Sequence, residues 1–154
     1  MHIRKAAPDD LETVFQITQQ TIRTVYPHYY PSGAVDFFAQ HHKKDNIRTD
    51  IAAGIVYLLT DNADTACGTV TLRDNEICRL FVLPEYQGNG YGRALLDFAE
   101  AEITKTFDEI VIDASFSAKA IYRKRGYHET AYHIIDTENG DHLCYDVMHK
   151  STTH

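Results

Sequence analysis

The chain has 154 residues, 44% of them hydrophobic, which is enough for one buried core and hardly for two, so we expect a single domain over residues 1–150 and a disordered tail over 151–154. Its formal net charge of −7 at pH 7 disfavours nucleic acid as the main partner, because phosphate backbones are bound by clustered positive charge, and it suits a cationic amine better. The sequence shows no run of about 18 apolar residues and no signal-peptide core, which predicts a cytoplasmic protein without a membrane partner.

The first part of the chain predicts one short strand and two helices. Residues 3–6 form the strand. Apolar residues then recur at helical spacing over 11–25, behind an Asp9–Glu12 capping box, and predict the first helix. Two prolines and a glycine stop regular structure over 26–33, where three tyrosines either wall an acceptor pocket or pack on the core. A second helix is expected over 34–42, and the three residues after it continue its polar end.

The period then changes to the alternation of β-strands. Three β-rich runs, 55–59, 68–72 and 76–82, are separated by polar turns at 61–64 and 74–75. Because such short turns join strands that lie side by side, these runs predict an antiparallel meander of three strands.

Three glycines alternate with other residues between the last of these strands and an apolar helical run. The segment reads Gln87-Gly88-Asn89-Gly90-Tyr91-Gly92-Arg93, and the helix is expected over about 90–104. Glycines bring backbone N–H groups close to a ligand, and the first N–H groups of a helix carry partial positive charge. The pattern therefore indicates a phosphate site. The helix is expected to turn these residues inward: Leu95, Leu96, Ala99 and Ile103.

Two common phosphate loops do not fit this segment. A Walker A loop ends in Gly-Lys-Ser/Thr, which does not occur here. A dinucleotide-binding fingerprint needs a small residue where Arg93 stands, and it belongs to an opening strand and turn rather than to the middle of a chain. Positive charge for an anionic ligand would come from a few side chains: Arg93, Lys119, Arg123, Lys124 and Arg125. The last four of these alternatively form a solvated helix face.

The C-terminal part predicts a strand, a short helix and a hairpin. The strand at 109–113 is reached through a helix, which makes it a parallel neighbour of the strand before the glycines. A short helix starts at 115–117 and ends at Gly126, whose backbone allows a left-handed cap. Asn139-Gly140 is a strong hairpin turn. The two hairpin strands are expected over 127–135 and 142–148.

Two motifs, in this order, resemble those of the GNAT superfamily of N-acetyltransferases. Its coenzyme A loop has the pattern Gln-x-x-Gly-x-Gly, matched here by Gln87, Gly90 and Gly92. Its Tyr-x-x-x-Gly-Phe/Tyr motif with an upstream alanine is matched by Ala118, Tyr122, Gly126 and Tyr127. Many members have asparagine where this chain has Ser115, and the spacing from Ala114 to Tyr122 is similar to a sub-pattern that includes bacterial YafP-like members.

The resemblance covers nearly the whole chain and implies an α/β (α+β) fold. Helices would flank a mixed, mostly antiparallel central sheet that has a parallel, splayed strand pair at the coenzyme A site. The implied activity is transfer of the acetyl group of acetyl-CoA to a primary amine, of a small molecule or of a peptide or protein, by direct attack in a ternary complex. Relatives are often dimers, so a second copy is one expected partner. A different class stays open, in which the chain is a regulatory module that binds acetyl-CoA without transferring the acetyl group.

The resemblance also assigns residues to the coenzyme. The backbone of Leu80, Phe81 and Val82 would pair with the pantetheine arm. The pyrophosphate would be bound by the backbone N–H groups of Gln87, Gly88, Asn89, Gly90, Tyr91, Gly92 and Arg93. The N–H of Leu80 would polarise the thioester carbonyl, a contribution of about 3 kcal/mol to lowering the barrier. Ser115 and Ala118 are the further expected coenzyme contacts.

A general base is expected because attack needs a neutral amine. A lysine-like amine has a pKa near 10.4, so less than about one part in a thousand is neutral at pH 7. Glu76 lies as far before the glycine loop as the catalytic glutamate of histone-acetylating members, although it is alternatively a solvated residue after a turn. Strand alternation predicts that Glu76 shares a face with Cys78, Leu80 and Val82. Asp113, at the end of the facing strand, is the other candidate base, or else the cap of the next helix.

The motif match favours Tyr122 as the general acid. A phenol with a pKa of about 10 protonates a departing thiolate, whose own pKa is about 8.5. The alternative is a tyrosine that buries its ring in a helix and ties its hydroxyl to a carbonyl.

The cysteines and histidines do not suggest further chemistry. The three cysteines have neither paired nor metal-like spacing, which predicts reduced thiols, and Cys78 is a buried strand residue rather than a nucleophile. The nine histidines lack metal-ligand spacing, so no metal is expected.

Overall fold

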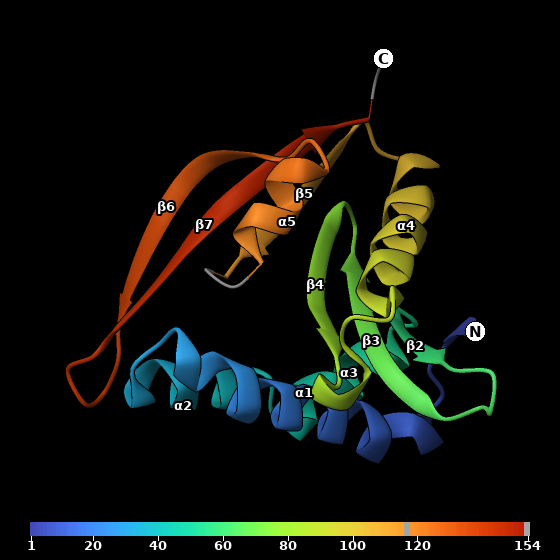
Figure 1. The fold of residues 1–154 in the computed structure, drawn as a ribbon, viewed down its shortest axis with the longest axis horizontal. Coiled ribbons are helices and arrows are strands. Elements are labelled where there is room, and N and C mark those ends of the chain that lie inside the picture. Colours follow the sequence, from blue (N-terminus) through green and yellow to red (C-terminus); the bar gives the residue numbers. More distant parts are fainter. Residues whose placement is uncertain (116–117, 153–154) are drawn as a thin grey trace.

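The predicted meander lies at the centre of a seven-stranded sheet in the computed structural model, which describes residues 1–115 and 118–152 (Figure 1). Strands β2 (Val56–Thr60), β3 (Ala66–Arg73) and β4 (Glu76–Val82) pair antiparallel in chain order. The turn after β2 is fixed by the Asp61 carboxylate, which accepts hydrogen bonds from the backbone N–H groups of Ala63 and Thr65, both at 2.9 Å. The meander is therefore confirmed: β4 coincides with its predicted run, β2 is shifted by one residue, and β3 is longer than predicted by two residues at its start and one at its end.

The remaining strands complete a mixed sheet. Strand β5 (Glu109–Ala114) pairs parallel with β4, whereas every other neighbouring pair is antiparallel. The strand order is β1-β2-β3-β4-β5-β7-β6, with β1 (His2–Lys5) at one edge and β6 (His128–Asp136) at the other, beside β7 (His142–Ser151). The parallel pair and the mostly antiparallel sheet confirm the predicted fold class.

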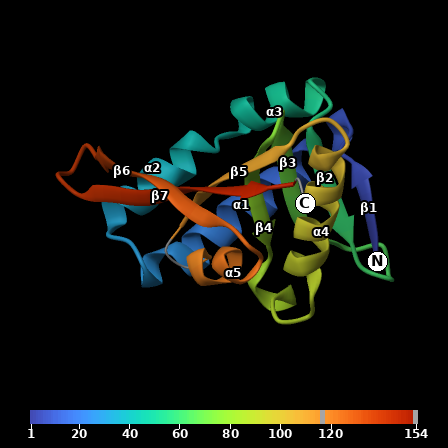
Figure 2. The same ribbon diagram turned by 90° about the horizontal axis from the view of Figure 1, so that it is seen from above.

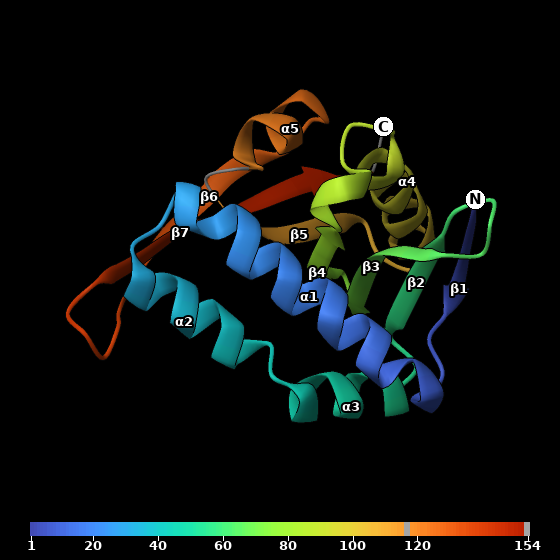
Figure 3. The same cartoon turned by 60° about the horizontal axis from the view of Figure 1, so that its bottom comes forward.

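Helices cover both faces of this sheet, and each face has its own core. On one face lie α1 (Leu11–Val25), α2 (Ser32–His41) and α3 (Lys44–Ala52), which Figure 3 shows in front of the strands. On the other lie α4 (Tyr91–Thr104) and α5 (Lys119–Lys124), on either side of β4 in the view from above (Figure 2). The α4 residues predicted to point inward are all buried: Leu95, Leu96, Ala99 and Ile103. No helix in the described part of the chain is long and apolar enough to cross a membrane.

The sequence did not predict α3. The expected second helix ends at His41, and a separate helix begins at Lys44 where a polar tail was expected. Only Ile47 and Ile51 of α3 are buried apolar residues. They lie four residues apart and share one helical face, but two apolar residues in a polar segment are too few for a periodic pattern. The second helix also begins earlier than predicted, at Ser32.

The predicted Asp9–Glu12 capping box does not form. A short 3-10 turn over Pro8–Asp10 precedes α1, and no side chain caps the first turn of α1. The Asp10 carboxylate instead accepts a hydrogen bond from Ala7 N at 2.8 Å and pairs with Arg4 at 2.7 Å. The carboxylate therefore fixes the chain before the helix rather than the helix end itself.

The hairpin of β6 and β7 extends beyond the other strands of the sheet, and its tip lies at the start of α2 (Figure 1). Its turn is closed by Thr137 N, which donates to Asp141 O at 2.8 Å, and the Asp141 carboxylate accepts from Gly33 N at 2.8 Å. Strand β7 runs to Ser151, and Thr152 donates to Asp108 O at 2.8 Å, so ordered backbone enters the predicted tail by two residues. The predicted start of the short helix at Phe116 and Ser117, and the tail residues Thr153 and His154, lie outside the described residues.

Alanine at Gly33 is expected to separate the hairpin turn from α2. A Cβ atom there would lie 1.9 Å from Asn139 Oδ1, so the turn has to move and the Gly33–Asp141 hydrogen bond is lost. We expect the free energy of unfolding in urea to fall by about 1 to 3 kcal/mol, as for hydrogen bonds to charged groups. Gly92→Ala is the matched control in another first helical turn, because its Cβ would meet only Val82 Cγ2 at 3.9 Å. Equal stability of the two variants would contradict the packing described for Gly33.

Candidate functional site

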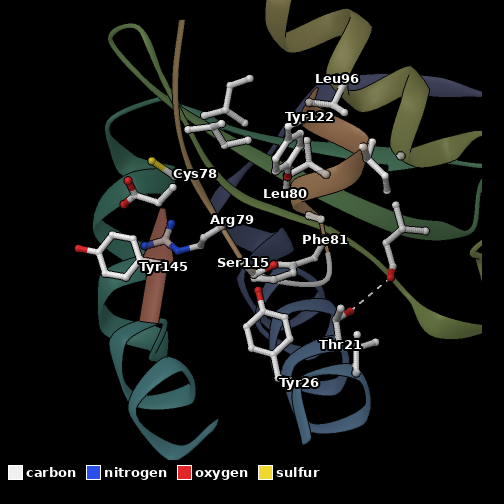
Figure 4. A pocket seen from close by; sticks show the side chains of 18 of the residues that line it. Thr21, Tyr26, Cys78, Arg79, Leu80, Phe81, Leu96, Ser115, Tyr122 and Tyr145 are labelled. Carbon is white, nitrogen blue, oxygen red and sulfur yellow. Dashed lines mark hydrogen bonds between the residues drawn. The ribbon is translucent and has the colours of Figure 1, made fainter. Parts of the chain in front are cut away.

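The parallel strands β4 and β5 separate after a short contact. They are in register only at Glu76 with Val111 and at Ile77 with Ile112. Beyond that point a cavity of about 1050 Å³ opens between them, bounded by the C-terminal end of α1, α2, the first turn of α4, and α5 (Figure 4). The splayed pair expected at the site is thus present, and it leaves the backbone of β4 after Ile77 without a strand partner on the β5 side, within the described residues.

An extra residue in β4 causes the separation. Thr71 is paired with Cys78 and Thr69 with Phe81, so three steps along β4 oppose two along β3. Arg79 takes up the extra step with φ of 44°, a left-handed conformation that costs a non-glycine residue roughly 1 to 2 kcal/mol. This β-bulge bends β4, and strand alternation fails across it.

The prediction that Glu76, Cys78, Leu80 and Val82 share one face is therefore wrong. Ile77 and Val82 belong to the core beneath α4, and Leu80 packs against the same core. Glu76 and Cys78 flank Ile77, so they face the opposite side, toward the helices α1 to α3. The bulge thus separates the candidate base from Leu80, whose side chain points to the α4 side.

The glycine segment forms one end of the cavity. Gly88 and Gly90 have φ of 83° and 84°, and Gly90 is the N-terminal cap of α4. No protein atom lies within 4 Å of where a Cβ would be placed at either residue, among those the structure describes. Both glycines line the cavity, together with Gly92 and Arg93. Backbone N–H groups at a helix N-terminus beside an open space fit the phosphates of an anionic ligand.

Three other residues of this segment have structural contacts. The Gln87 side-chain amide donates to Val82 O at 3.0 Å, and Asn89 donates to Tyr86 O at 3.0 Å. The ring of Tyr91 packs on that of Tyr86, with centroids 6.2 Å apart. Asn89 and Tyr91 do not belong to the cavity wall, so their side chains face away from the space that the glycines leave open.

The candidate cations divide into paired and unpaired groups. Lys119 lies 2.7 Å from Asp146, Arg123 pairs with Glu129, and Arg125 pairs with Asp97 and Glu100. Arg93 and Lys124 line the cavity and form no ion pair with a described residue. These two side chains are the ones whose positive charge is available to an anion at the glycine end.

Two tyrosines, of which Tyr122 is buried and Tyr26 is partly buried, meet the cavity from opposite sides. Tyr122 of α5 has 6% of its surface exposed, and burial raises its pKa to about 12. Tyr26 follows α1, its hydroxyl is hydrogen-bonded to Ser115 at the end of β5, and burial raises its pKa as well. Figure 4 shows Tyr122 beside Leu80 and Tyr26 pointing toward Ser115. Both phenols therefore keep their protons at neutral pH.

Both candidate bases line the cavity. Glu76 is partly buried at the start of β4, and Asp113 reaches solvent through the cavity near the end of β5. Desolvation by the surrounding walls raises the pKa of Asp113, against the opposing influence of His133 and His41. A carboxylate with a raised pKa is a better proton acceptor for an amine than an ordinary one.

The tyrosines of the loop that follows α1 divide between the cavity wall and the core. Tyr26 and Tyr29 line the cavity, whereas Tyr30 is 6% exposed and belongs to the core under α1 to α3.

Cys78 also lines the cavity, and burial raises its pKa to about 12, so its thiol stays protonated. A nucleophilic role for Cys78 is disfavoured, as expected. Among residues 1–115 and 118–152, no group of three or more His, Cys, Asp or Glu side chains is arranged to hold a metal ion.

Sequence reasoning missed a buried cluster around Arg79. The Arg79 side chain is 5% exposed, and its Nη1 lies 2.6 Å from the Asp50 carboxylate. Its Nε donates to His42 Nδ1 at 3.1 Å, and burial lowers the pKa of His42 to about 3, so the imidazole is neutral with its proton on Nε2. Arg79 and His42 line the same cavity. The available signal was a charged residue inside an apolar strand run, but its partners His42, just after α2, and Asp50, in α3, are far away in sequence.

Comparisons with known proteins agree on one family and one fold. Residues 25–143 match the family model described as an acetyltransferase (GNAT) domain. A GCN5-related N-acetyltransferase structure from Rhodopseudomonas palustris is similar, with 22% identity, a TM-score of 0.88, and coverage of 97% of this chain and 94% of that one. The PaiA N-acetyltransferase of Thermoplasma acidophilum, in complex with coenzyme A, has 21% identity, a TM-score of 0.74, and coverage of 97% and 98%. YncA of Salmonella typhimurium, a putative acetyltransferase with acetyl-CoA, has 19% identity, a TM-score of 0.74, and coverage of 100% and 95%. No curated protein matches the chain.

Proposed function

The chain belongs to the GNAT family of acetyltransferases, and from this we propose that it transfers the acetyl group of acetyl-CoA to a primary amine by direct attack in a ternary complex. The observation that carries the proposal is the cavity between β4 and β5, whose wall includes both the glycine segment and the candidate acid and bases Tyr122, Glu76 and Asp113. The PaiA and YncA structures hold coenzyme A and acetyl-CoA, respectively, in folds of this kind.

The glycine end fits the coenzyme. Gly88 and Gly90 leave an open space at the N-terminus of α4, and the same cavity is lined by Arg93 and Lys124, which form no ion pair with a described residue. We assign the pyrophosphate to the backbone N–H groups of residues 87–93. Of the side chains in that range, that of Arg93 alone lines the cavity without a hydrogen-bond partner among the described residues, since the Gln87 amide is bonded to Val82 O.

The open edge of β4 fits the pantetheine arm. Amides of the arm can pair with the backbone of Leu80, Phe81 and Val82 as an added strand would. The Val82 carbonyl already accepts from Gln87 at 3.0 Å and from Thr21 at 3.5 Å, and the Phe81 carbonyl points toward Gly68 of β3, so the backbone of Leu80 is the part of this run that we expect to pair with the arm. Ala118 lines the wall where the arm would run, and Ser115 is held near it by Tyr26.

The chemistry that we propose needs a base, an oxyanion donor and an acid. Asp113 or Glu76 takes a proton from the amine, whose nitrogen forms the new bond to the acetyl carbon. The N–H of Leu80 stabilises negative charge on the carbonyl oxygen. The carbon–sulfur bond breaks, and Tyr122 gives its proton to the departing sulfur. Acetyl-CoA supplies the activated acetyl group, and the products are an amide and coenzyme A.

Release of free thiol tests this function. Purified protein is incubated with acetyl-CoA and a pooled panel of amino acids, monoamines, polyamines, aminoglycosides and peptides, and thiol formation is followed by absorbance. We expect release that depends on an acceptor and stops when the active pool is withdrawn. Tight binding of acetyl-CoA by calorimetry, with no acceptor-dependent release on this panel, would instead identify a regulatory module that binds acetyl-CoA without transfer.

A further inference from the structure

Arg79 lines the cavity next to the residue whose backbone is assigned to the thioester. It precedes Leu80, whose N–H is the proposed oxyanion donor, and the two neighbouring side chains lie on different sides of the strand: Arg79 contacts His42 and Asp50, whereas Leu80 packs against the core beneath α4. Figure 4 shows Arg79 near Cys78 and Tyr145 at one end of the cavity, with Tyr122 and Leu96 at the other. A positive charge is thus placed one residue from the reacting carbonyl, on the side opposite the coenzyme end.

The charge of Arg79 is only partly neutralised. Asp50 is its ion-pair partner at 2.6 Å, but Arg73 already holds both oxygens of that carboxylate, each at 3.0 Å from Nη2. His42 is neutral and adds no charge. Glu76 and Asp113 share the cavity with Arg79, and neither forms an ion pair with it in the described part of the chain. Two arginines therefore share one carboxylate, which leaves one positive charge for a ligand.

Arg79 also has a hydrogen-bond donor to spare. Its Nε donates to His42 and its Nη1 to Thr71 Oγ1, at 3.1 and 3.3 Å. No residue that the structure describes accepts from Nη2, and this atom is not among the buried polar atoms that lack a partner. Guanidinium groups held rigidly in this way select planar anions such as carboxylates.

The wall of the cavity that Arg79 lines is mainly apolar. It includes these aromatic and aliphatic side chains: Tyr29, Phe37, Phe38, Ile135, Leu143 and Tyr145. A polyamine would lose hydration of its distant charges against such walls, and Arg79 would repel them. An apolar side chain would gain from burial there.

We propose that the acceptor is an amino acid with an apolar side chain, whose carboxylate pairs with Arg79 while its amino group faces the carboxylates of Asp113 and Glu76. This inference rests on the proposed function of the same cavity. Arg79 then acts as the residue that determines specificity, and a matched amine without a carboxylate is a poor ligand.

Pairs of ligands that differ only in the carboxylate test the inference. L-phenylalanine is compared with 2-phenylethylamine, and L-leucine with 3-methylbutylamine, with spermidine as the polyamine. Binding to the protein saturated with coenzyme A is measured by calorimetry, and thiol release with acetyl-CoA is measured separately. We expect each amino acid to bind about 10- to 100-fold more tightly than its matched amine, as for a charged hydrogen-bonded pair. Equal or weaker binding of both amino acids would overturn the inference.

Two arginine variants separate this role from a structural one. Arg79→Gln is expected to abolish the difference within each pair, and Arg79→Lys to restore part of it. Arg73→Gln is the matched control, because Arg73 holds the same Asp50 carboxylate but does not line the large cavity, and it should keep the difference. Circular dichroism melting checks that each variant folds. If Arg79→Gln does not fold, the comparison of ligand pairs on the unmodified protein decides alone.

The two proposals fail in different ways. If thiol release depends on an acceptor but is as fast with the amines as with the amino acids, the transferase function is supported. The proposal that the acceptor is an amino acid is then overturned. Selective binding of the amino acids without thiol release from any acceptor supports the carboxylate site and overturns the transferase.

Discussion

Replacement of Tyr122 by phenylalanine is expected to lower kcat by about 100-fold and to leave the Kd for acetyl-CoA unchanged. The phenol is buried in the cavity wall, and burial keeps it protonated by raising its pKa to about 12. Phenylalanine preserves the ring and its packing in the core with Leu96 and Tyr127, so the variant removes only the proton donor. Initial rates with saturating substrates and calorimetry with acetyl-CoA measure the two effects.

Tyr127→Phe is the control for this experiment. Tyr127 is 3% exposed, its ring lies 5.8 Å from that of Tyr122, and its hydroxyl has no hydrogen-bond partner among the described residues. It does not line the cavity, so its variant should keep full activity and equal or greater stability. Turnover of Tyr122→Phe within twofold of the parent would rule out the general acid role. A larger loss in Tyr26→Phe than in Tyr122→Phe would move that role to the phenol of Tyr26.

Alanine at Gly90 is expected to weaken coenzyme A binding by about 10- to 100-fold. Its φ of 84° strains any residue with a Cβ, and the Cβ would enter the open space in which the pyrophosphate is proposed to lie. Relief of the strain would also rotate the N–H groups of the first turn of α4 away from that space. Calorimetry with coenzyme A measures the loss of affinity.

Gly140→Ala separates backbone strain from ligand contact. Gly140 has the same φ of 84°, no atom lies within 4 Å of its Cβ position among the described residues, and it lies in the hairpin turn outside the cavity wall. Both variants should lose about 1 to 2 kcal/mol of stability, but only Gly90→Ala should lose affinity. Equal affinity losses would show that destabilisation alone explains the effect. No loss in Gly90→Ala would remove the glycine segment from the proposed phosphate site.

Several conclusions from the sequence are still predictions. The assignment of Tyr122, Glu76 and the coenzyme contacts, the single domain, the cytoplasmic location, the homodimer and the YafP-like sub-pattern all await experiment. Ser115 stands where many relatives have asparagine, and the structure shows that its side chain is hydrogen-bonded to Tyr26.

Local patterns were sufficient for most of the fold. The alternation in β2 to β4, the amphipathic stripe of α4 and the Asn139-Gly140 turn each depend on residues near one another in sequence. Helix α3 was missed for the same reason, because its two buried isoleucines are recognised as core residues only once the core that they pack against is known. A single inserted residue at Arg79 reversed the predicted face of Leu80 and Val82, because side chains alternate with a period of two.

The sequence by itself determined the family, the order of the strands and the glycine segment, because these depend on short motifs and on periodicity. Only the tertiary structure decided which charges are free. Within residues 1–115 and 118–152, Arg93 and Lys124 form no ion pair, whereas Lys119, Arg123 and Arg125 are paired, and Arg79 shares Asp50 with Arg73. The physical reason is that an ion pair depends on a distance of a few ångströms, and its partners come from elements far apart in the chain.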